Sequence, residues 1–505
     1  MLTSPKNAAP EQPGDGNEAR AHPPSSRSAR RLLAYPWVIV GVLLVAFSTG
    51  LLLWARTSPG FDPYGWLVWG YQTLRLNLNL GGAPSWKPVT FLFTVPYSIF
   101  GHLSYWLWMV TAISIALAGP IFAGRIVYKV VLDSSEERWA AIVGAVFAGL
   151  CLLGIVQYTH YWLSAQSDPM LVTFFLAAVD MHLHRRPRWA LAFLWLSSLG
   201  RPETWPFLAL YSIWIWREIP KTRRLVVGAW VLLAFFWFGV PVLSGNSPFV
   251  AGQLAENSPR MLHSGKIIGT IDRFRALTYW PVKLAAGIGV LLALWRRNRV
   301  TLVIAGMSAL WMVIEVAFAL HGFPGVPRYM FEAAGAMIVV AGIGVGWLLT
   351  EFRRFSRLAQ LAGVAGVVAL VGFSVPGALA QEHYEHKDLI HERARTAEIH
   401  RLDATIKALG GYKFIRSCGD PTSDVEYVSV LAWYTKLDVG YVGHRPEYMI
   451  TDQTKPLVLF TALFNGWIVH TYHQTAKQPA TCSRLNGAYW IVTPQRPGGF
   501  LGHQT

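Results

Sequence analysis

The sequence has 505 residues, of which 53% are hydrophobic and only 14% charged, and its mean hydropathy is +0.34. About a quarter of the residues in a soluble domain are charged, so this composition excludes an ordinary soluble protein. The formal charge of +16 would suit nucleic acid only if the basic residues gathered on one soluble face, and here they lie between apolar runs. We therefore expect a protein surrounded by membrane lipids, with no nucleic-acid partner.

The first 31 residues are rich in Pro, Ser, Ala and charged residues, which predicts a disordered arm. The apolar run that follows is long enough to span a bilayer, and no clear cleavage site comes after it, so we expect a retained helix. About eleven transmembrane helices are predicted in all. Their expected ranges are 33–55, 103–127, 139–158, 168–184, 189–201, 203–217, 225–244, 276–295, 300–320, 333–350 and 358–379.

Lys and Arg concentrate in every second connection between these ranges. The basic connections hold Arg125, Lys129 and Arg138; Arg185, Arg186 and Arg188; Arg217, Lys221, Arg223 and Arg224; Arg296, Arg297 and Arg299; and Arg353, Arg354 and Arg357. Because short basic loops stay in the cytoplasm, we expect a multi-pass protein of the inner (plasma) membrane whose amino terminus is cytoplasmic. The odd number of spans then predicts a transmembrane domain at 32–380, with a long outer loop at 56–102, and an extracytoplasmic tail at 381–505.

The tail is expected to form a small soluble α/β domain. Residues 382–409 are helix formers without Gly or Pro, and alternating or β-branched runs typical of strands follow at 425–434, 457–463, 467–472 and 489–492. Cys418 and Cys482 also lie in the tail. In an oxidising compartment they would form a disulfide, and otherwise they would be two reduced thiols packed as small hydrophobes; the pattern leaves both interpretations open.

An acidic residue stands at the start of the long outer loop, in Phe61-Asp62-Pro63. An ionisable group at the membrane surface is a functional candidate, and Asp62 could act as a general base that takes the proton of an acceptor hydroxyl. The alternative is that Asp62 caps a helix beginning at Pro63.

The same loop continues with Trp86 and Lys87 in a stretch rich in turn-forming residues. Lys87 could pair with a phosphate, and Trp86 could stack on a sugar. Both residue types are also common anchors at the membrane interface, which is the alternative for each.

Further candidates lie at the outer ends of predicted spans. Asp168 begins one span and has the same capping alternative as the first aspartate. Arg201 and Glu203 lie between two short spans that could form a broken hairpin, and they could simply neutralise each other as a buried pair. Arg328, followed by Tyr329, has a guanidinium suited to a phosphate diester, with snorkelling to the interface as its alternative.

These segments, in this order, resemble the GT-C superfamily of integral-membrane glycosyltransferases, in which an acidic residue follows the first helix in a long outer loop. The chain is particularly similar to actinobacterial members with an Asp-Pro, a Pro-Ser-Trp-Lys-Pro, a Ser-acidic-Pro and a Leu-x-Arg-Pro-Glu segment. Here these segments lie at 62–63, 84–88, 167–169 and 199–203. The resemblance covers roughly residues 32–350.

The resemblance implies that a sugar is transferred from a polyprenyl-phosphate carrier, at the outer face, to a cell-envelope acceptor that is a glycan, a lipid or a protein. It implies that Asp62 is the base and that Arg328, beside Tyr329, holds the donor phosphate, helped by Lys87 or Arg201. Cations would stabilise the leaving phosphate while the base deprotonates the acceptor, and direct displacement would invert the anomeric centre. The remaining acids, Asp168 and Glu203, are expected to support these groups.

Two other functions fit parts of the pattern. A transporter or flippase of lipid-linked sugars would also combine several spans with internal charges, although such proteins often contain paired repeats with broken helices, and we find no convincing repeat. A non-catalytic assembly subunit whose tail binds cell-wall polymer would tolerate mutation of Asp62 but not loss of residues 381–505. The sequence contains no metal-binding His or Cys motif and no phosphate-binding glycine loop, so we expect no metal and no cofactor.

Overall fold

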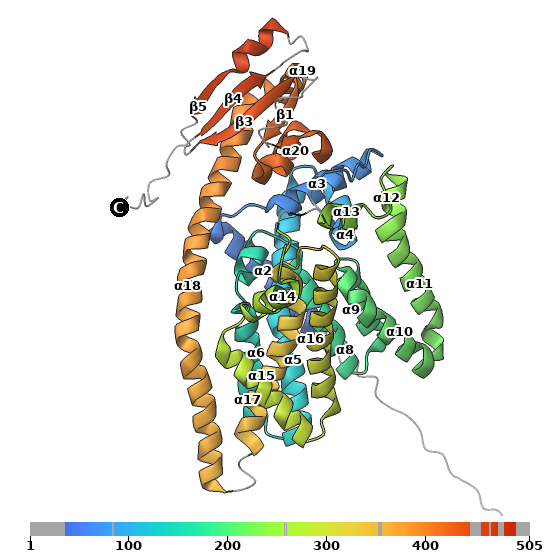
Figure 1. Ribbon diagram of the computed structural model, residues 1–505, viewed down its shortest axis with the longest axis vertical. Coiled ribbons are helices and arrows are strands. Elements are labelled where there is room, and N and C mark those ends of the chain that lie inside the picture. Colours follow the sequence, from blue (N-terminus) through green and yellow to red (C-terminus); the bar gives the residue numbers. More distant parts are fainter. Residues whose placement is uncertain are drawn as a thin grey trace, which may run out of the picture. The chain divides into compact units, whose positions relative to one another are not determined.

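The structure is a computed structural model that describes residues 36–82, 85–256, 258, 260–351, 356–444, 456–463, 466–472 and 479–490. The expected disordered arm at 1–31 lies outside these residues. The chain divides into two units, Met1–Leu43 and Leu44–Thr505, and the contacts described below all lie within the second. Figure 1 shows this unit as a set of helices followed by a small sheet.

The helical part consists of long apolar helices joined by short ones. Several helices begin at or next to a proline, whose fixed φ and missing N–H suit the first turn. Short 3₁₀ helices at Ser98–Phe100, Pro202–Thr204, Pro220–Thr222 and Pro327–Met330, and a π-helical turn at Phe235–Gly239, link some of the elements. The α-helices are α2 (Pro36–Ala55), α3 (Phe61–Leu74), α4 (Pro88–Tyr97), α5 (Leu103–Ser135), α6 (Arg138–Leu153), α7 (Tyr158–Leu163), α8 (Asp168–Leu183), α9 (Pro187–Ser198), α10 (Trp205–Glu218), α11 (Arg223–Ala234), α12 (Val240–Leu243), α13 (Val250–Glu256), α14 (Lys266–Arg275), α15 (Trp280–Trp295), α16 (Arg299–Leu320) and α17 (Phe331–Glu351), with α18 (Arg357–Ala408) after them.

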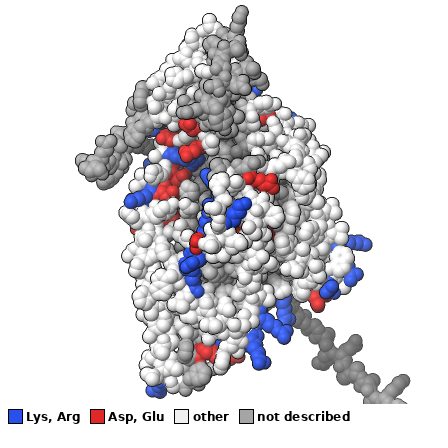
Figure 2. All heavy atoms as spheres, in the orientation of Figure 1, with Lys and Arg blue, Asp and Glu red and all other residues white. Residues whose placement is uncertain are grey.

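Among the described residues, six helices are long and apolar enough to cross a membrane, and α14 with α15, bent by 97°, would make a seventh. The protein is a multi-pass membrane protein. In Figure 2 broad areas over the helices carry no Lys, Arg, Asp or Glu, as contact with lipid requires. Each of the eleven predicted ranges contains a helix, but α6, α8, α9 and α10 have only 12 to 16 residues, so a count of eleven full crossings is not confirmed.

Helix α17 packs against several other helices and is almost completely buried. Its glycines allow neighbouring backbones to approach closely, as in other membrane bundles. A methyl group added at Gly344 would lie 2.6 Å from the carbonyl oxygen of Ala285 in α15, and one at Gly342 would lie 2.7 Å from that of Gly144 in α6. This packing fixes the helix whose first turn follows Arg328.

Helix α18 is one continuous helix of 52 residues. The sequence predicted a span that ends at 379 and a separate helix from 382, and that interruption is wrong, because the helix continues from the apolar stretch into the charged one. Figure 1 shows α18 running beside the other helices and ending under the strands. Its later half is tied to the end of α2, because Arg393 Nε donates to the carbonyl oxygen of Ala55 at 2.8 Å.

The residues after α18 form a small α/β domain, as predicted. Two helices, α19 (Gly411–Cys418) and α20 (Val428–Thr435), accompany a five-stranded sheet of order β2-β1-β3-β4-β5. Strand β1 is parallel to β2 and β3, while the pairs β3–β4 and β4–β5 are antiparallel. The strands are β1 (Asp420–Ser423), β2 (Gly443–His444), β3 (Leu457–Leu463), β4 (Gly466–Tyr472) and β5 (Gly487–Trp490).

The predicted strands of this domain had different outcomes. Those at 457–463 and 467–472 are confirmed, but 425–434 is wrong, because it forms a 3₁₀ turn and α20. Every residue from Val428 to Trp433 is buried, and a short run that is apolar throughout has no period to separate a strand from a buried helix. Of the range 489–492, the first two residues lie in β5 and the others are outside the described residues.

The two cysteines of the tail are bonded to each other. Cys418 ends α19, and Cys482 lies in the 3₁₀ helix Ala480–Leu485; the disulfide joins their Cα atoms at 5.6 Å. Of the two interpretations that the sequence left open, the structure has the disulfide.

Candidate functional site

Seven charged side chains from five parts of the chain meet in one place, which we call the charged cluster. One comes from the first turn of α3, one precedes α4, one begins α8, two lie between α9 and α10, and two lie at and just before the start of α17. In chain order they are Asp62, Lys87, Asp168, Arg201, Glu203, Arg328 and Glu332. Six of the seven were candidates from the sequence alone.

The first part of the cluster, which we call the buried half, consists of Lys87, Asp168, Arg201, Glu203 and Glu332. Lys87 Nζ lies 3.4 Å from Asp168 Oδ1, and Arg201 Nη2 donates to the same oxygen. The other guanidinium nitrogens of Arg201 lie 3.5 Å from Glu332 Oε1 and 3.8 Å from Glu203 Oε1. Buried charges require such partners, so the positive charge of Arg201 is already used within the protein.

Lys87 is held in position by a hydroxyl group and a carboxylate. Its Nζ donates to Ser167 Oγ at 2.9 Å. Burial lowers the pKa of Lys87, Asp168 raises it, and Arg201 and Arg328 lower it again, so that the net result is a lowered pKa.

The second part of the cluster, the open pair, consists of Asp62 and Arg328. Arg328 Nη2 lies 3.5 Å from Asp62 Oδ2, and the two side chains keep 14% and 13% of their surface exposed, against 3% for Arg201. The guanidinium lies near the rings of Tyr161 and Tyr329, 5.6 and 5.7 Å from their centroids, and its Nε has no hydrogen-bond partner in the described part of the chain. At 3.5 Å the contact is at the limit of a hydrogen bond, so donors of Arg328 are available to a ligand.

Arg201 connects the two parts of the cluster. Its Nη2 lies 3.3 Å from the backbone carbonyl of Arg328, and its guanidinium carbon lies 4.3 Å from the centroid of the Tyr329 ring. On the other side, Trp311 Nε1 donates to the carbonyl of Tyr329 at 2.9 Å. These contacts hold the backbone of Arg328 and Tyr329 while they leave the guanidinium of Arg328 weakly engaged.

Neither aspartate caps its helix, which was the alternative for both. Helix α3 begins at Phe61 after Gly60, and α8 begins at Asp168 after Ser167, and no side chain caps either helix. The carboxylates of Asp62 and Asp168 instead contact cations from distant parts of the chain. Their position therefore matters to the cluster and not to the local helix ends.

Trp86 lies outside the charged cluster. Its ring packs edge-on against Trp69 and Phe91, at centroid distances of 5.6 and 5.2 Å, and its Nε1 donates to the carbonyl of Phe236 at 3.1 Å. The side chain is 2% exposed. The expected stacking of Trp86 on a sugar stays a prediction that none of its contacts supports.

Sequence reasoning missed Glu332 and Tyr161. An acidic residue inside an apolar run is a signal in itself, and Glu332 lies four residues after Arg328, on the same side of a helical turn. Tyr161 had no comparable signal, because it is one of many aromatic residues. Another acid inside an apolar run, Glu315, is buried in α16 and has an oxygen with no hydrogen-bond partner among the residues described.

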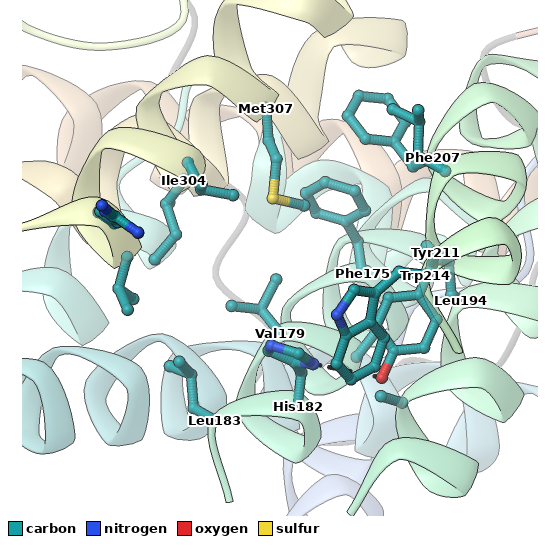
Figure 3. Close-up of a pocket in the computed structure, with 16 residues that line it drawn as sticks. Phe175, Val179, His182, Leu183, Leu194, Phe207, Tyr211, Trp214, Ile304 and Met307 are labelled. Atoms are coloured by element: carbon teal, nitrogen blue, oxygen red, sulfur yellow. Dashed lines mark hydrogen bonds between the residues drawn. The ribbon is translucent and has the colours of Figure 1, made fainter. Parts of the chain in front are cut away.

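A separate cavity of about 420 Å³ lies between α8, α9, α10 and α16. Figure 3 shows Met307 and Phe207 on one side of it and His182 and Leu183 on the other. Its lining is almost entirely apolar, so it offers space for hydrocarbon and few groups for acid–base chemistry or phosphate binding. The charged cluster, and not this cavity, is the candidate active site.

The chemistry available to the charged cluster is proton acceptance and anion binding. A carboxylate can accept a proton from a hydroxyl within hydrogen-bond reach, and a guanidinium with free donors can bind phosphate through two parallel hydrogen bonds. Within the described ranges, no group of three or more His, Cys, Asp and Glu side chains could hold a metal ion.

Comparisons with known proteins identify no close relative. No protein-family model matches the chain, and no curated protein matches it significantly. Among solved structures, the chain is similar to ArnT from Cupriavidus metallidurans bound to undecaprenyl phosphate, with 13% identity, a TM-score of 0.49 and coverage of 85% of this chain and 93% of that one. The apo state of the same protein gives 15% identity with the same TM-score and coverage. A TM-score below 0.5 does not establish a common fold, so the function rests on the site itself.

Proposed function

We propose that the protein is an inverting membrane glycosyltransferase that moves a sugar from a polyprenyl-phosphate carrier to an acceptor of the cell envelope. The observation that carries this proposal is the open pair, a carboxylate and an incompletely engaged guanidinium 3.5 Å apart. The reaction requires a base for the acceptor hydroxyl and a cation for the leaving phosphate at adjoining positions. The order of the sequence motifs, similar to that of the GT-C superfamily, supports the same function.

In the proposed reaction, Arg328 binds the donor phosphate and gives up its long contact with Asp62. Asp62 accepts the proton of the acceptor hydroxyl, and the hydroxyl oxygen attacks the anomeric carbon on the face opposite the phosphate. The bond between the anomeric carbon and the phosphate oxygen breaks, and polyprenyl phosphate leaves with the electron pair, stabilised by Arg328 and Lys87. A single displacement of this kind inverts the anomeric centre.

Arg201, in the buried half, has a different role in the proposal. The guanidinium of Arg201 is surrounded by Asp168, Glu203 and Glu332, so it has little positive charge left for a substrate. Its contact with the backbone of Arg328 makes it a positioning residue. We propose that Arg201 acts on the donor through Arg328.

We further propose that the charged cluster faces the outer leaflet of the plasma membrane. Arg125 pairs with Asp180 near the end of α8, and Arg296 pairs with Glu351 at the end of α17, whereas the cluster lies at the beginnings of these two helices. The basic connections therefore lie at the opposite ends of α8 and α17 from the cluster. Because basic loops stay in the cytoplasm, this separation supports an outward-facing site.

The orientation can be tested with a cysteine placed at Arg75, an exposed residue at the end of α3. A membrane-impermeant thiol reagent should label this cysteine in intact cells. Labelling only after lysis would contradict the orientation.

The test of the reaction compares purified Asp62→Asn and Arg328→Ala proteins with wild type, using a labelled lipid-linked sugar and an envelope extract as acceptor. We expect Asp62→Asn to lower the transfer rate by about 100-fold to 10,000-fold, as loss of a general base does, while donor lipid remains bound. Asp272→Asn is the matched control, because this aspartate is exposed in α14 and pairs only with Arg275 within the described residues.

Two outcomes would contradict the proposal. Undiminished transfer by Asp62→Asn would remove that residue from the mechanism. Movement of the labelled lipid across a liposome membrane, without any transfer of its sugar, would support a flippase in place of a transferase.

A further inference from the structure

A second polar site lies where the end of α3 meets the carboxy-terminal domain. A cavity of about 290 Å³ there is lined by Tyr71, Gln72 and Arg75 from α3 and its end, by Arg416 from α19, and by Lys436 and Asp438 after α20, among others. Gln72 Nε2 donates to Asp438 Oδ1 and so joins the two walls of the cavity. We call this site the cationic pocket.

The cationic pocket contains more positive charge than its own residues neutralise. Three cations line it, Arg75, Arg416 and Lys436, and Asp438 is its one carboxylate. None of the three cations forms an ion pair with another residue of the described chain. With three cations and one carboxylate, the lining has an excess of two positive charges around a cavity large enough for a small anionic group.

Contacts with Tyr71 hold two of the cations close together. The guanidinium carbon of Arg75 lies 4.1 Å, and Lys436 Nζ 5.3 Å, from the centroid of the Tyr71 ring. Burial lowers the pKa of Lys436, the charge of Arg75 lowers it further, and Asp403 acts in the opposite direction. The pocket thus keeps like charges near one another, an arrangement that an added anion would stabilise.

Each of these cations also lies at the carboxyl end of a helix. Lys436 ends α20 in the left-handed conformation, with φ at 59°, and a cation at a helix carboxyl end is favourable for the helix itself. Arg75 likewise ends α3, and Arg416 lies in the last turn of α19, so the same favourable interaction applies to them, but it does not require the three helix ends to meet at one cavity. Three elements that each place a cation at one cavity indicate a binding site.

We propose that the cationic pocket binds an anionic substituent, a phosphate or a carboxylate, on the sugar acceptor. That the anionic ligand is the sugar acceptor rests on the proposed function, whereas the existence of an anion site does not. Thirteen residues of helix separate Asp62 from Arg75, which at 1.5 Å per residue corresponds to about 20 Å. The acceptor would therefore be held by its anionic group at one end of α3 while its hydroxyl reacts at the other, and the carboxy-terminal domain would contribute to acceptor choice.

The experiment measures binding of glucose 6-phosphate, glucuronate and glucose to the full-length protein in lipid nanodiscs, without donor, by isothermal titration calorimetry. We expect one or both anions to bind more tightly than glucose, with an affinity that falls as salt is added. Arg75→Gln and Arg416→Gln should each weaken the anion at least tenfold, and Arg416→Lys should restore part of it. Lys413→Gln is the matched control, because this residue is exposed on α19 but does not line the cavity.

The two anions distinguish a phosphate site from a carboxylate site. The inference is overturned if glucose binds as well as both anions, if neither anion binds, or if Arg75→Gln and Arg416→Gln bind as wild type does. Because binding is measured without transfer, its absence in a protein that transfers sugar overturns this inference alone. Binding that persists in a protein without transferase activity overturns the proposed function and leaves the anion site.

Discussion

The two parts of the charged cluster contain similar residues but use them differently. In the buried half, Arg201 contacts three carboxylates and is 3% exposed, while in the open pair Arg328 has one long contact with Asp62 and is 14% exposed. A cation whose charge is balanced on every side stabilises the fold, whereas a cation with free donors can bind a substrate. The comparison indicates that the role of an arginine in this cluster depends on how completely neighbouring carboxylates neutralise its charge, and not on its residue type.

The largest expected effect is on stability, from Arg201→Gln. This change leaves Asp168 and Glu332 buried without their cation, and breaking a buried pair in this way costs about 3–5 kcal/mol. We expect a markedly lower unfolding temperature in detergent, with partial recovery in Arg201→Lys because a lysine cannot reproduce the planar fork. An unfolding temperature equal to that of wild type would contradict the stabilising role of Arg201 in the buried half.

The next effect separates stability from binding, through Arg328→Gln. The contact between Arg328 and Asp62 is long, at 3.5 Å, and both side chains are more exposed than Arg201, so the unfolding temperature should change less than in Arg201→Gln. Binding of labelled polyprenyl phosphate should fall about 10-fold to 100-fold, as loss of hydrogen bonds to a charged group does. Arg328→Gln could instead destabilise the protein as strongly as Arg201→Gln and bind the lipid normally. That result would contradict the assignment of lipid binding to the open pair and of stabilisation to the buried half.

The smallest effect concerns α7, which carries Tyr161 beside the open pair. In this helix His160 Nδ1 lies 3.0 Å from Asp388 of α18. Burial lowers the pKa of His160, but the hydrogen bond and charge of Asp388 raise it by more, so the net pKa is raised above its ordinary value of 6.5. A raised pKa in the folded protein means that the stabilisation is complete below pH 6.5 and is lost as the pH rises through the raised pKa.

We therefore expect the unfolding temperature of wild type to fall more steeply than that of His160→Gln as the pH rises above about 6.5. The two curves should meet on the alkaline side, where the wild-type imidazole has lost its proton. Parallel curves across this range would show that the contact between His160 and Asp388 contributes nothing that depends on protonation.

The sequence located most of the candidate site because buried charges are costly. A charged residue beside an apolar run has few structural reasons to be there, so Asp62, Asp168 and Arg328 were identified from their positions alone. The division of the cluster into two parts could not be predicted, since it depends on which residues from distant segments touch. Glu332 had the same signal, an acidic residue inside an apolar run, but was not selected, and its contact with Arg201 places it in the cluster.

The fold was predictable where length and hydropathy decide it and less so elsewhere. The ranges of the apolar helices follow from composition, but α3 and α4 lie in what the sequence described only as a long loop. The continuity of α18 beyond residue 379 was missed because the sequence changes there from an apolar stretch to a charged one, and such a change predicts two separate helices. The burial of Trp86 depends on packing against Trp69 and Phe91, which no local pattern reveals.

Because α18 is continuous, the number of its residues sets the angle at which the carboxy-terminal domain is rotated relative to α3. Successive residues of an α-helix are rotated by about 100°, since a turn has 3.6 residues. One residue inserted into α18 after Thr396 would therefore turn the sheet and α20 by that angle relative to α3, and would separate Gln72 from Asp438, which now hydrogen-bond to each other. The exact number of residues in this helix, more than their identity, thus aligns the cationic pocket with the charged cluster.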